Sequence, residues 1–340
     1  MAKYTDNFGI GFLGGNDLFH TIQMAKCAEV AGFTNCWIAE DYFFGGAFST
    51  ATACAMNTSS IEIGIGVINP YTRHPALSAM EVAALDAVSK GRTILGLGAS
   101  NKRWIEQQMG IPFKNSQVAT KETVEIIRAL IKDKSVNFNG DYFKTGNIHL
   151  EFEPYRSDLP IYLGVKGPKA LRTAGKIADG VLTSIMTSLD YIKYVKERLH
   201  EGADEAGRDL SNFNVGSYLL IYISEDKEKA KSIVKPLISK YLGIHGDHPI
   251  LTSTGMDPLE ISKFKKALLK GEDASEWVTD WMIDTFAIVG TPEECRSKLK
   301  AFTDLGVHYP IAFQIPGVPI EETINQISEH IFNHKVDSRS

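Results

Sequence analysis

The prediction of the fold rests on residues 61–98, IEIGIGVINPYTRHPALSAMEVAALDAVSKGRTILGLG. Residues 61–67 are predicted to form a buried strand, in which residues 63–67 are apolar and alternate with glycine, a sign of close backbone contacts. Residues 76–88 have the apolar spacing of a helix, and Ser89-Lys90-Gly91 ends it. Residues 92–97 form a second short apolar strand. The stretch therefore predicts one strand–helix–strand unit of an α/β protein.

The same alternation continues in both directions along the chain. Further strands are predicted near residues 8–13, 35–39, 161–163, 180–182, 214–223 and 308–314, most of them followed by a helical pattern. About eight strand–helix units in one order favour a closed (β/α)8 TIM barrel over an open doubly wound sheet. The whole chain, residues 1–340, is expected to form a single domain of this kind.

Two segments interrupt the predicted barrel. Residues 135–150 carry Asn139-Gly140 between two short extended runs, which predicts a hairpin insertion. Residues 226–288 are mostly polar with helical spacing and provide no barrel strand. We therefore expect a second, helical insertion before the last strand.

The composition excludes several classes of function. A net charge of −5, a pI near 6.0 and scattered charges give no surface for nucleic acid or an anionic membrane. The four cysteines form no C-x-x-C pair, and the N-terminus lacks the apolar core of a signal peptide. These features predict a cytoplasmic protein that acts on a small molecule, with no nucleic-acid or membrane partner.

In a TIM barrel the functional site lies in the loops after the carboxyl ends of the strands. Glu40 and Asp41 stand side by side after the second strand, and two neighbouring carboxylates suit acid–base chemistry. Both are candidate catalytic residues. A solvated loop or a helix cap is the alternative interpretation of the pair.

The loop Gly164-Val165-Lys166-Gly167-Pro168-Lys169 joins a predicted strand to a predicted helix. The free N–H groups of that helix start, together with a lysine, suit a phosphate. An ordinary strand-to-helix turn is the alternative. The first strand is followed by no G-x-G-x-x-G motif, which disfavours a Rossmann nicotinamide site.

The histidines give weaker signals. His74 precedes Pro75 and suits a helix cap better than an acid or base. His245 and His248 flank Asp247 in the manner of a metal cluster, but no further ligand follows in the insertion. A surface loop is the preferred interpretation, and no metal site is predicted.

Four motifs, taken in order, resemble the bacterial-luciferase-like superfamily of flavin- and deazaflavin-dependent oxidoreductases. They are I-G-I-G-V-I-N-P-Y-T-R-H-P-A (63–76), A-L-D-A-V-S-K-G-R-T-I-L-G-L-G (84–98), L-G-V-K-G-P-K-A-L-R-T-A-G-K-I-A-D-G (163–180) and V-G-T-P-E-E (289–294). Within the superfamily, N-P-Y-x-R-x-P and G-x-x-G-P resemble the archaeal methylenetetrahydromethanopterin reductases of one-carbon metabolism, which use coenzyme F420.

The resemblance implies a deazaflavin, coenzyme F420, at the mouth of the barrel, with its phosphate at Gly167-Pro168. It also implies a cis peptide bond between Gly66 and Val67 against the ring, and a homodimer or a dimer of dimers. The cofactor-binding residues expected on this basis are Gly66, Val67, Ile68, Asn69, Gly98, Ala99, Ser100, Val165, Lys166, Gly167 and Pro168.

Three positions depart from the reductase pattern. Gly11 stands where the reductases have a glutamate, Glu40-Asp41 replaces Asp-His, and Asn101 replaces an acidic residue. The leading hypothesis is hydride transfer between F420 and a one-carbon-carrying tetrahydropterin or a small alcohol. An FMN-dependent monooxygenase of the same fold is the first alternative. A non-catalytic flavin-binding paralogue is the second.

Overall fold

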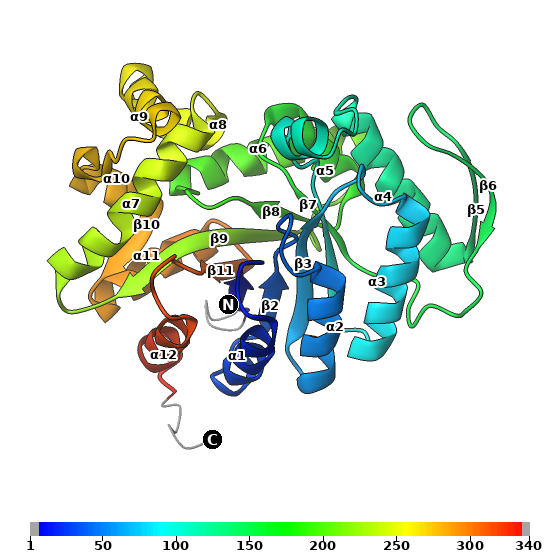
Figure 1. The fold of residues 1–340 in the computed structure, drawn as a ribbon, viewed down its shortest axis with the longest axis horizontal. Coiled ribbons are helices and arrows are strands. Elements are labelled where there is room, and N and C mark those ends of the chain that lie inside the picture. Colours follow the sequence, from blue (N-terminus) through cyan, green and yellow to red (C-terminus); the bar gives the residue numbers. More distant parts are fainter. Residues whose placement is uncertain (1–6, 335–340) are drawn as a thin grey trace.

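The computed structural model describes residues 7–334 and contains a closed parallel barrel (Figure 1). Within these residues, eight strands close in the order β9-β11-β1-β2-β3-β4-β7-β8, and β8 pairs with β9. The predicted TIM barrel is confirmed. The barrel strands are β1 (Gly9–Phe12), β2 (Asn35–Ile38), β3 (Glu62–Ile68), β4 (Thr93–Leu97), β7 (Ile161–Gly164), β8 (Gly180–Thr183), β9 (Asn214–Ile223) and β11 (Tyr309–Phe313).

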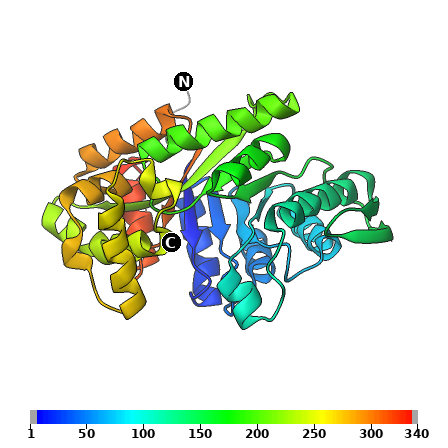
Figure 2. The same ribbon diagram turned by 90° about the horizontal axis from the view of Figure 1, so that it is seen from above.

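Helices surround the strands and cover the outer face of the barrel, as the view from above shows (Figure 2). The apolar cluster between strands and helices includes Ile63 and Ile65, which are fully buried on the outer face of β3. A smaller cluster, with Trp37 and Tyr162, fills the barrel interior. The helices are α1 (Leu18–Val30), α2 (Ala47–Asn57), α3 (Pro75–Ser89), α4 (Ser116–Asp133), α5 (Pro168–Ile177), α6 (Leu189–Ala206), α11 (Pro292–Asp304) and α12 (Ile320–His330).

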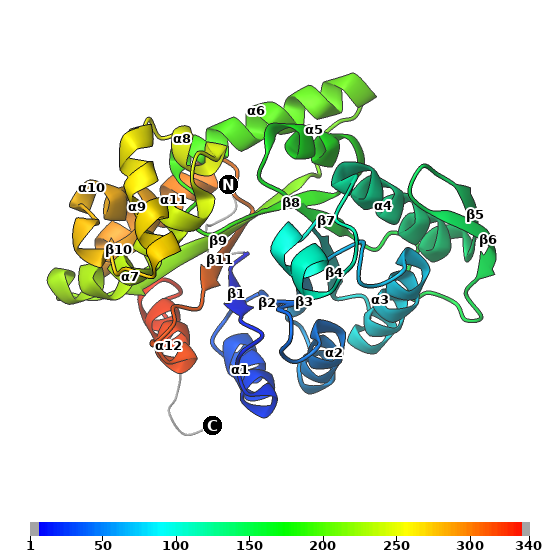
Figure 3. The same ribbon diagram turned by 45° about the horizontal axis from the view of Figure 1, so that its top comes forward.

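The two predicted insertions lie on opposite sides of the barrel (Figures 1 and 3). Strands β5 (Ser135–Asn139) and β6 (Lys144–His149) form the antiparallel hairpin. Its turn is fixed by the buried carboxylate of Glu122 in α4, which accepts N–H bonds from Asp141, Tyr142 and Phe143. The helical insertion comprises α7 (Lys227–His245), α8 (Pro249–Thr252), α9 (Pro258–Lys270), a short 3-10 turn at Ser275–Trp277 and α10 (Asp280–Phe286).

One strand was not predicted. Strand β10 (Ala287–Gly290) pairs in parallel with Leu220–Ile223, the second half of β9. The first half of β9 pairs with β11 inside the barrel, so the ten-residue strand β9 extends beyond the barrel and offers a free edge. Four residues directly before a helix start carry too little periodicity for such a strand to be recognised.

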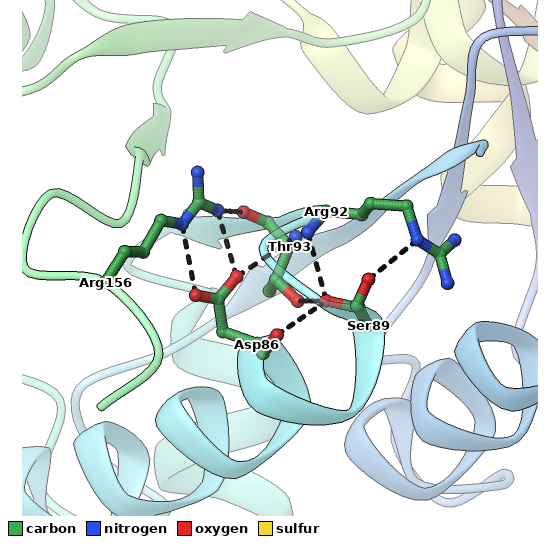
Figure 4. A network of polar contacts seen from close by, with 5 residues as sticks. All are labelled: Asp86, Ser89, Arg92, Thr93 and Arg156. Carbon is green, nitrogen blue, oxygen red and sulfur yellow. Dashed lines mark hydrogen bonds and ion pairs between the residues drawn. The ribbon is translucent and has the colours of Figure 1, made fainter. Parts of the chain in front are cut away.

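A buried polar network fixes the beginning of β4 (Figure 4). Nε and Nη2 of Arg156 each lie 3.0 Å from an oxygen of Asp86 in α3, and Nη2 also donates to the carbonyl of Thr93 at 2.6 Å. The hydroxyls of Ser89 and Thr93 are 2.9 Å apart, and Arg92 Nη1 donates to Ile61 O at 2.6 Å. The polar residues of the A-L-D-A-V-S-K-G-R-T motif therefore hold α3 to the amino end of β4, away from the carboxyl ends where barrel sites lie.

Candidate active site at the mouth of the barrel

A cavity of about 290 Å³ opens at the carboxyl ends of the barrel strands, where the sequence places the site. Residues from seven barrel strands or the loops after them, and from helix α7 of the insertion, form its wall. They are Gly11, Phe12, Leu13, Trp37, Ala39, Asp41, Gly66, Val67, Gly164, Val165, Lys166, Leu182, Thr183, Ser184, Ile185, Tyr218, Tyr241 and Phe313. Five of the predicted site residues are among them: Asp41, Gly66, Val67, Val165 and Lys166.

Val67 forms part of the cavity floor. The peptide bond between Gly66 and Val67 is cis, as expected, and the pairing of β3 with β4 shifts register between Ile65 and Ile68. The Val67 side chain lies so close to two neighbouring strands that a Cβ at Gly98 or Gly164 would come within 2.7 or 2.8 Å of it. These glycines leave room for Val67, so the floor is apolar and packed from below.

Asp41 and Glu40 lie in different environments. Asp41 lines the cavity, and its Oδ2 accepts a hydrogen bond from the Gly14 N–H at 3.0 Å. Glu40 points away from the cavity. Its Oε2 accepts from Ala47 N at 2.7 Å, the first residue of α2, and its Oε1 lies 3.9 Å from Arg73 Nη1. Glu40 therefore caps α2, whereas Asp41 is the carboxylate that faces the cavity.

A second group of predicted residues forms a polar rim beside the cavity. Asn69 is buried; its amide donates to the Tyr42 hydroxyl and to Thr72 Oγ1, and its Oδ1 accepts from the N–H groups of Tyr71 and Thr72. The buried Ser100 hydroxyl faces that of Tyr42 without a well-formed hydrogen bond, and it has no hydrogen-bond partner among the described residues. Ser100 also has a φ of 60°. This rim therefore carries one polar group whose hydrogen bonding the described residues leave incomplete.

The other predicted residues lie around the same region. Ile68 and Gly98 are buried beneath the rim, and Ala99 is partly buried. His74 caps α3, because its Nδ1 accepts from Ala76 N at 3.2 Å, in agreement with the preferred interpretation.

Asn101 is exposed, and its side chain accepts from Trp104 N at the start of a short π-helical turn (Arg103–Gln108). Of the positions that depart from the reductase pattern, Gly11 and Asp41 line the cavity, whereas Glu40 and Asn101 cap helices.

The start of α5 is surrounded by nitrogen donors. Gly167 is the N-cap residue and Pro168 the first helical residue, and no side chain caps this end. Lys166 lines the cavity, and none of the carboxylates in the described residues lies within salt-bridge distance of its ammonium group. Its Nζ lies 3.5 Å from His245 Nδ1, at the end of α7, and burial lowers its pKa. The helix end and the lysine together suit an anion.

The two insertion histidines are not on a surface loop; that interpretation is wrong. His245 is buried and His248 is half-buried, and burial together with the charge of Lys166 lowers their pKa values to about 3 and about 4. Both are therefore neutral at pH 7. His245 Nδ1 accepts from Lys166, so its Nε2 carries the proton and donates to Ile185 O at 3.3 Å. His248 Nδ1 accepts from Ile250 N, so its Nε2–H is the free donor, and it lies 3.8 Å from where a Cβ on Gly167 would stand.

The sequence did not identify the aromatic residues of the cavity wall, which are Phe12, Trp37, Tyr218, Tyr241 and Phe313. Tyr218 lies in the middle of β9, Phe313 ends β11, and Tyr241 comes from the insertion helix α7. In the sequence, a strand residue that points into the cavity cannot be distinguished from one that packs in the core. No pattern in the sequence indicates which face of an inserted helix lies over the barrel. The described residues contain neither a metal-binding cluster of His, Cys, Asp or Glu nor a helix that could span a membrane.

Comparison with known proteins agrees with this geometry. The chain is 35% identical to a 5,10-methylenetetrahydromethanopterin reductase from Methanolobus tindarius, over 95% of this chain and 99% of the relative. It is 31% identical to the enzyme of that name from Archaeoglobus fulgidus, over 95% and 98% of the two chains. The solved structure of the coenzyme F420-dependent tetrahydromethanopterin reductase from Methanopyrus kandleri superposes with a TM-score of 0.88, at 30% identity, over 98% and 100% of the two chains. Residues 5–309 match the family model described as luciferase-like monooxygenase, and the chain belongs to that family.

Proposed function

We propose that this chain is a coenzyme F420-dependent oxidoreductase that transfers a hydride between the deazaflavin and a one-carbon-carrying tetrahydropterin. The observation that carries the proposal is Lys166, which faces the cavity beside the uncapped start of α5. Lys166 is half-buried, and a cation partly removed from water without a carboxylate partner is stabilised when an anion binds next to it. The similarity to the reductases over the full length of the chain supports the choice of cofactor and substrate class.

The residues of the cavity fit a flat ring with an attached phosphate. Val67 and the Gly66–Val67 backbone offer an apolar surface for one face of a ring. The Ser100 hydroxyl lies at the rim, where a polar group of the ligand would complete its hydrogen bonding. When bound, the deazaflavin would supply a carbon that accepts or donates a hydride.

The protein's own groups would bind the cofactor, orient the substrate and exclude water. Lys166 and the first N–H groups of α5 would hold the phosphate, and His248 would add a neutral donor. Asp41 would position the substrate or relay a proton, because it is the cavity's carboxylate among the described residues. Tyr241 from the insertion covers part of the cavity and would exclude water.

The proposal is tested by titrating the purified protein with F420 and, separately, with FMN, following absorbance and fluorescence quenching. We expect saturable binding of F420 and much weaker binding of FMN. In the absence of oxygen, methylenetetrahydromethanopterin should then oxidise reduced F420. A small secondary alcohol should not reduce oxidised F420. Tight binding of FMN alone, with turnover that needs oxygen, would identify a monooxygenase. Binding of F420 without turnover of either substrate would identify a non-catalytic paralogue.

A further inference from the structure

Tyr218 crosses the barrel beneath the cavity. It belongs to β9, and its hydroxyl lies against Gly66 in β3, where an added Cβ would be 2.4 Å from the phenol oxygen. In the order β9-β11-β1-β2-β3 these strands are four steps apart, on opposite sides of an eight-stranded barrel. The phenol therefore spans the barrel and ends at the Gly66–Val67 floor.

The position of Tyr218 depends on Gly11. A Cβ at Gly11 would lie 3.0 Å from Cε1 of the Tyr218 ring, a tighter contact than side chains normally make. The other side of the ring meets Phe313 edge-on, with centroids 6.3 Å apart and planes at 88°. The absence of a side chain at Gly11 thus leaves the space that the phenol occupies, and the packed ring fixes where its hydroxyl points.

The Tyr218 hydroxyl is a donor without an acceptor. Tyr218 lines the cavity, and its hydroxyl makes no hydrogen bond to any other described residue. Burial, and then the negative charge of Asp41, raise the pKa of this phenol, so at neutral pH it keeps its proton. It can donate a hydrogen bond to a ligand, but it is not a base.

We propose that Tyr218 contacts the cofactor: its hydroxyl donates a hydrogen bond to an acceptor atom of the deazaflavin ring and holds the reduced ring more tightly than the oxidised ring. This inference rests on the proposed function. Acceptor atoms of a ring that has gained a hydride carry more negative charge, and hydrogen bonds to charged acceptors are roughly twice as strong as those between neutral groups. Because packing fixes the position of the Tyr218 hydroxyl, this donor stabilises the added negative charge of the reduced ring without having to move.

The experiment measures dissociation constants of oxidised and reduced F420 by absorbance and fluorescence, without substrate, for the wild type and Tyr218→Phe. The variant keeps the ring that packs over Gly11 and loses only the hydroxyl. We expect about tenfold weaker binding of the reduced form and less than about threefold weaker binding of the oxidised form. Tyr162→Phe is the matched control, because Tyr162 is a buried barrel phenol that does not line the cavity, and its affinities should equal those of the wild type.

A second variant guards against misfolding of the first. Gly66→Ala keeps the phenol but places a Cβ on its oxygen, so the ratio of the two dissociation constants should shift against the reduced form, as in Tyr218→Phe, even where the added methyl group weakens both forms. Unchanged affinities in Tyr218→Phe, or equal weakening of both forms, overturn the inference while leaving the proposed function intact. If the wild type binds neither form of F420, the proposed function itself fails, and this inference fails with it.

Discussion

At the scale of single residues, neighbours in sequence have separate tasks. Asp41 lines the cavity and Glu40 caps α2, so their substitutions should differ in effect. Asp41→Asn can still accept the Gly14 N–H bond, which preserves the loop while removing the charge. We expect it to lower kcat by about a hundredfold, with F420 affinity changed less than about threefold.

Glu40→Gln is the matched control, since the amide oxygen can still cap α2. Its kcat should remain within about threefold of the wild type, as expected for a group outside the reacting centre. Steady-state rates and F420 titrations of both variants decide whether Asp41, and not Glu40, acts in the reaction. Equal rates in all three proteins would show that Asp41 is a solvated loop residue.

Glu29 shows how a carboxylate far from the cavity stabilises a loop. Burial alone would raise its pKa, but N–H bonds from Ser59, Ser60 and Ile61 outweigh burial and lower the pKa to about 2 from an ordinary 4.5. The folded state therefore binds this proton less readily than the unfolded state does. The resulting stability is complete above pH 4.5 and is lost as the pH falls towards 2.

Glu29→Gln should thus lower the melting temperature at pH 7. The difference from the wild type should shrink between pH 5 and pH 2, because the native carboxylate becomes protonated there. Thermal unfolding followed by circular dichroism across this range measures the effect. A difference that stays constant with pH would mean that side-chain shape, and not charge, matters at this position.

At the scale of elements, the Asp86–Arg156 pair joins helix α3 to the segment before β7. The Asp86 side chain is 2% exposed and that of Arg156 is 26% exposed, so the carboxylate depends on its partner for solvation. Removal of one member of a buried pair typically costs about 3–5 kcal/mol. We expect Asp86→Asn to lower the free energy of unfolding by about 3 kcal/mol, measured by urea denaturation.

A surface pair provides the control for this prediction. Lys300 and Asp304 lie one turn apart on α11 and are both 61% exposed, so Asp304→Asn should cost about 0.5 kcal/mol or less. Similar losses in Asp86→Asn and Asp304→Asn would show that the network in Figure 4 contributes no more than a surface ion pair.

The elements that could be predicted were those whose signals are local. The Thr291-Pro292 helix start has the capping box that its sequence indicates, because Thr291 and Glu294 bond each other's backbone N–H groups. The Gly167-Pro168 helix start was equally local. By contrast, β10 depends on the free edge of a long strand, and Tyr218 on a glycine some 200 residues away in sequence. Contacts of that range leave no periodicity in a single sequence.

At the scale of the whole molecule, the barrel and its helical insertion meet at the start of α5. Lys166 and Gly167 come from the barrel and His248 from the insertion, and their donors face the same space, while His245 of the insertion bonds Lys166. An anion bound there would contact both parts. Cofactor binding should therefore stabilise the insertion as well as the barrel, by an amount set by ligand concentration and affinity.

Gly167 is the position at which to test this coupling. Its φ of −86° and ψ of 158° suit any residue, and a Cβ would meet only His248 Nε2, at 3.8 Å. The fold therefore does not require glycine here, and Gly167→Val should fold with a melting temperature close to that of the wild type. A branched side chain would nevertheless occupy the space where the phosphate oxygens bind, so we expect F420 affinity to fall by a hundredfold or more, about 2.7 kcal/mol.

Hydrogen exchange on the wild type and Gly167→Val, each with and without F420, reports on the coupling directly. In the wild type, F420 should slow exchange at the start of α5 and also in α7 and α8, because opening the insertion would then require release of the anion. In Gly167→Val neither region should gain protection at the same cofactor concentration. Protection confined to the barrel would show that the insertion histidines do not take part in binding. Undiminished F420 affinity in a folded Gly167→Val protein would mean that the phosphate lies elsewhere.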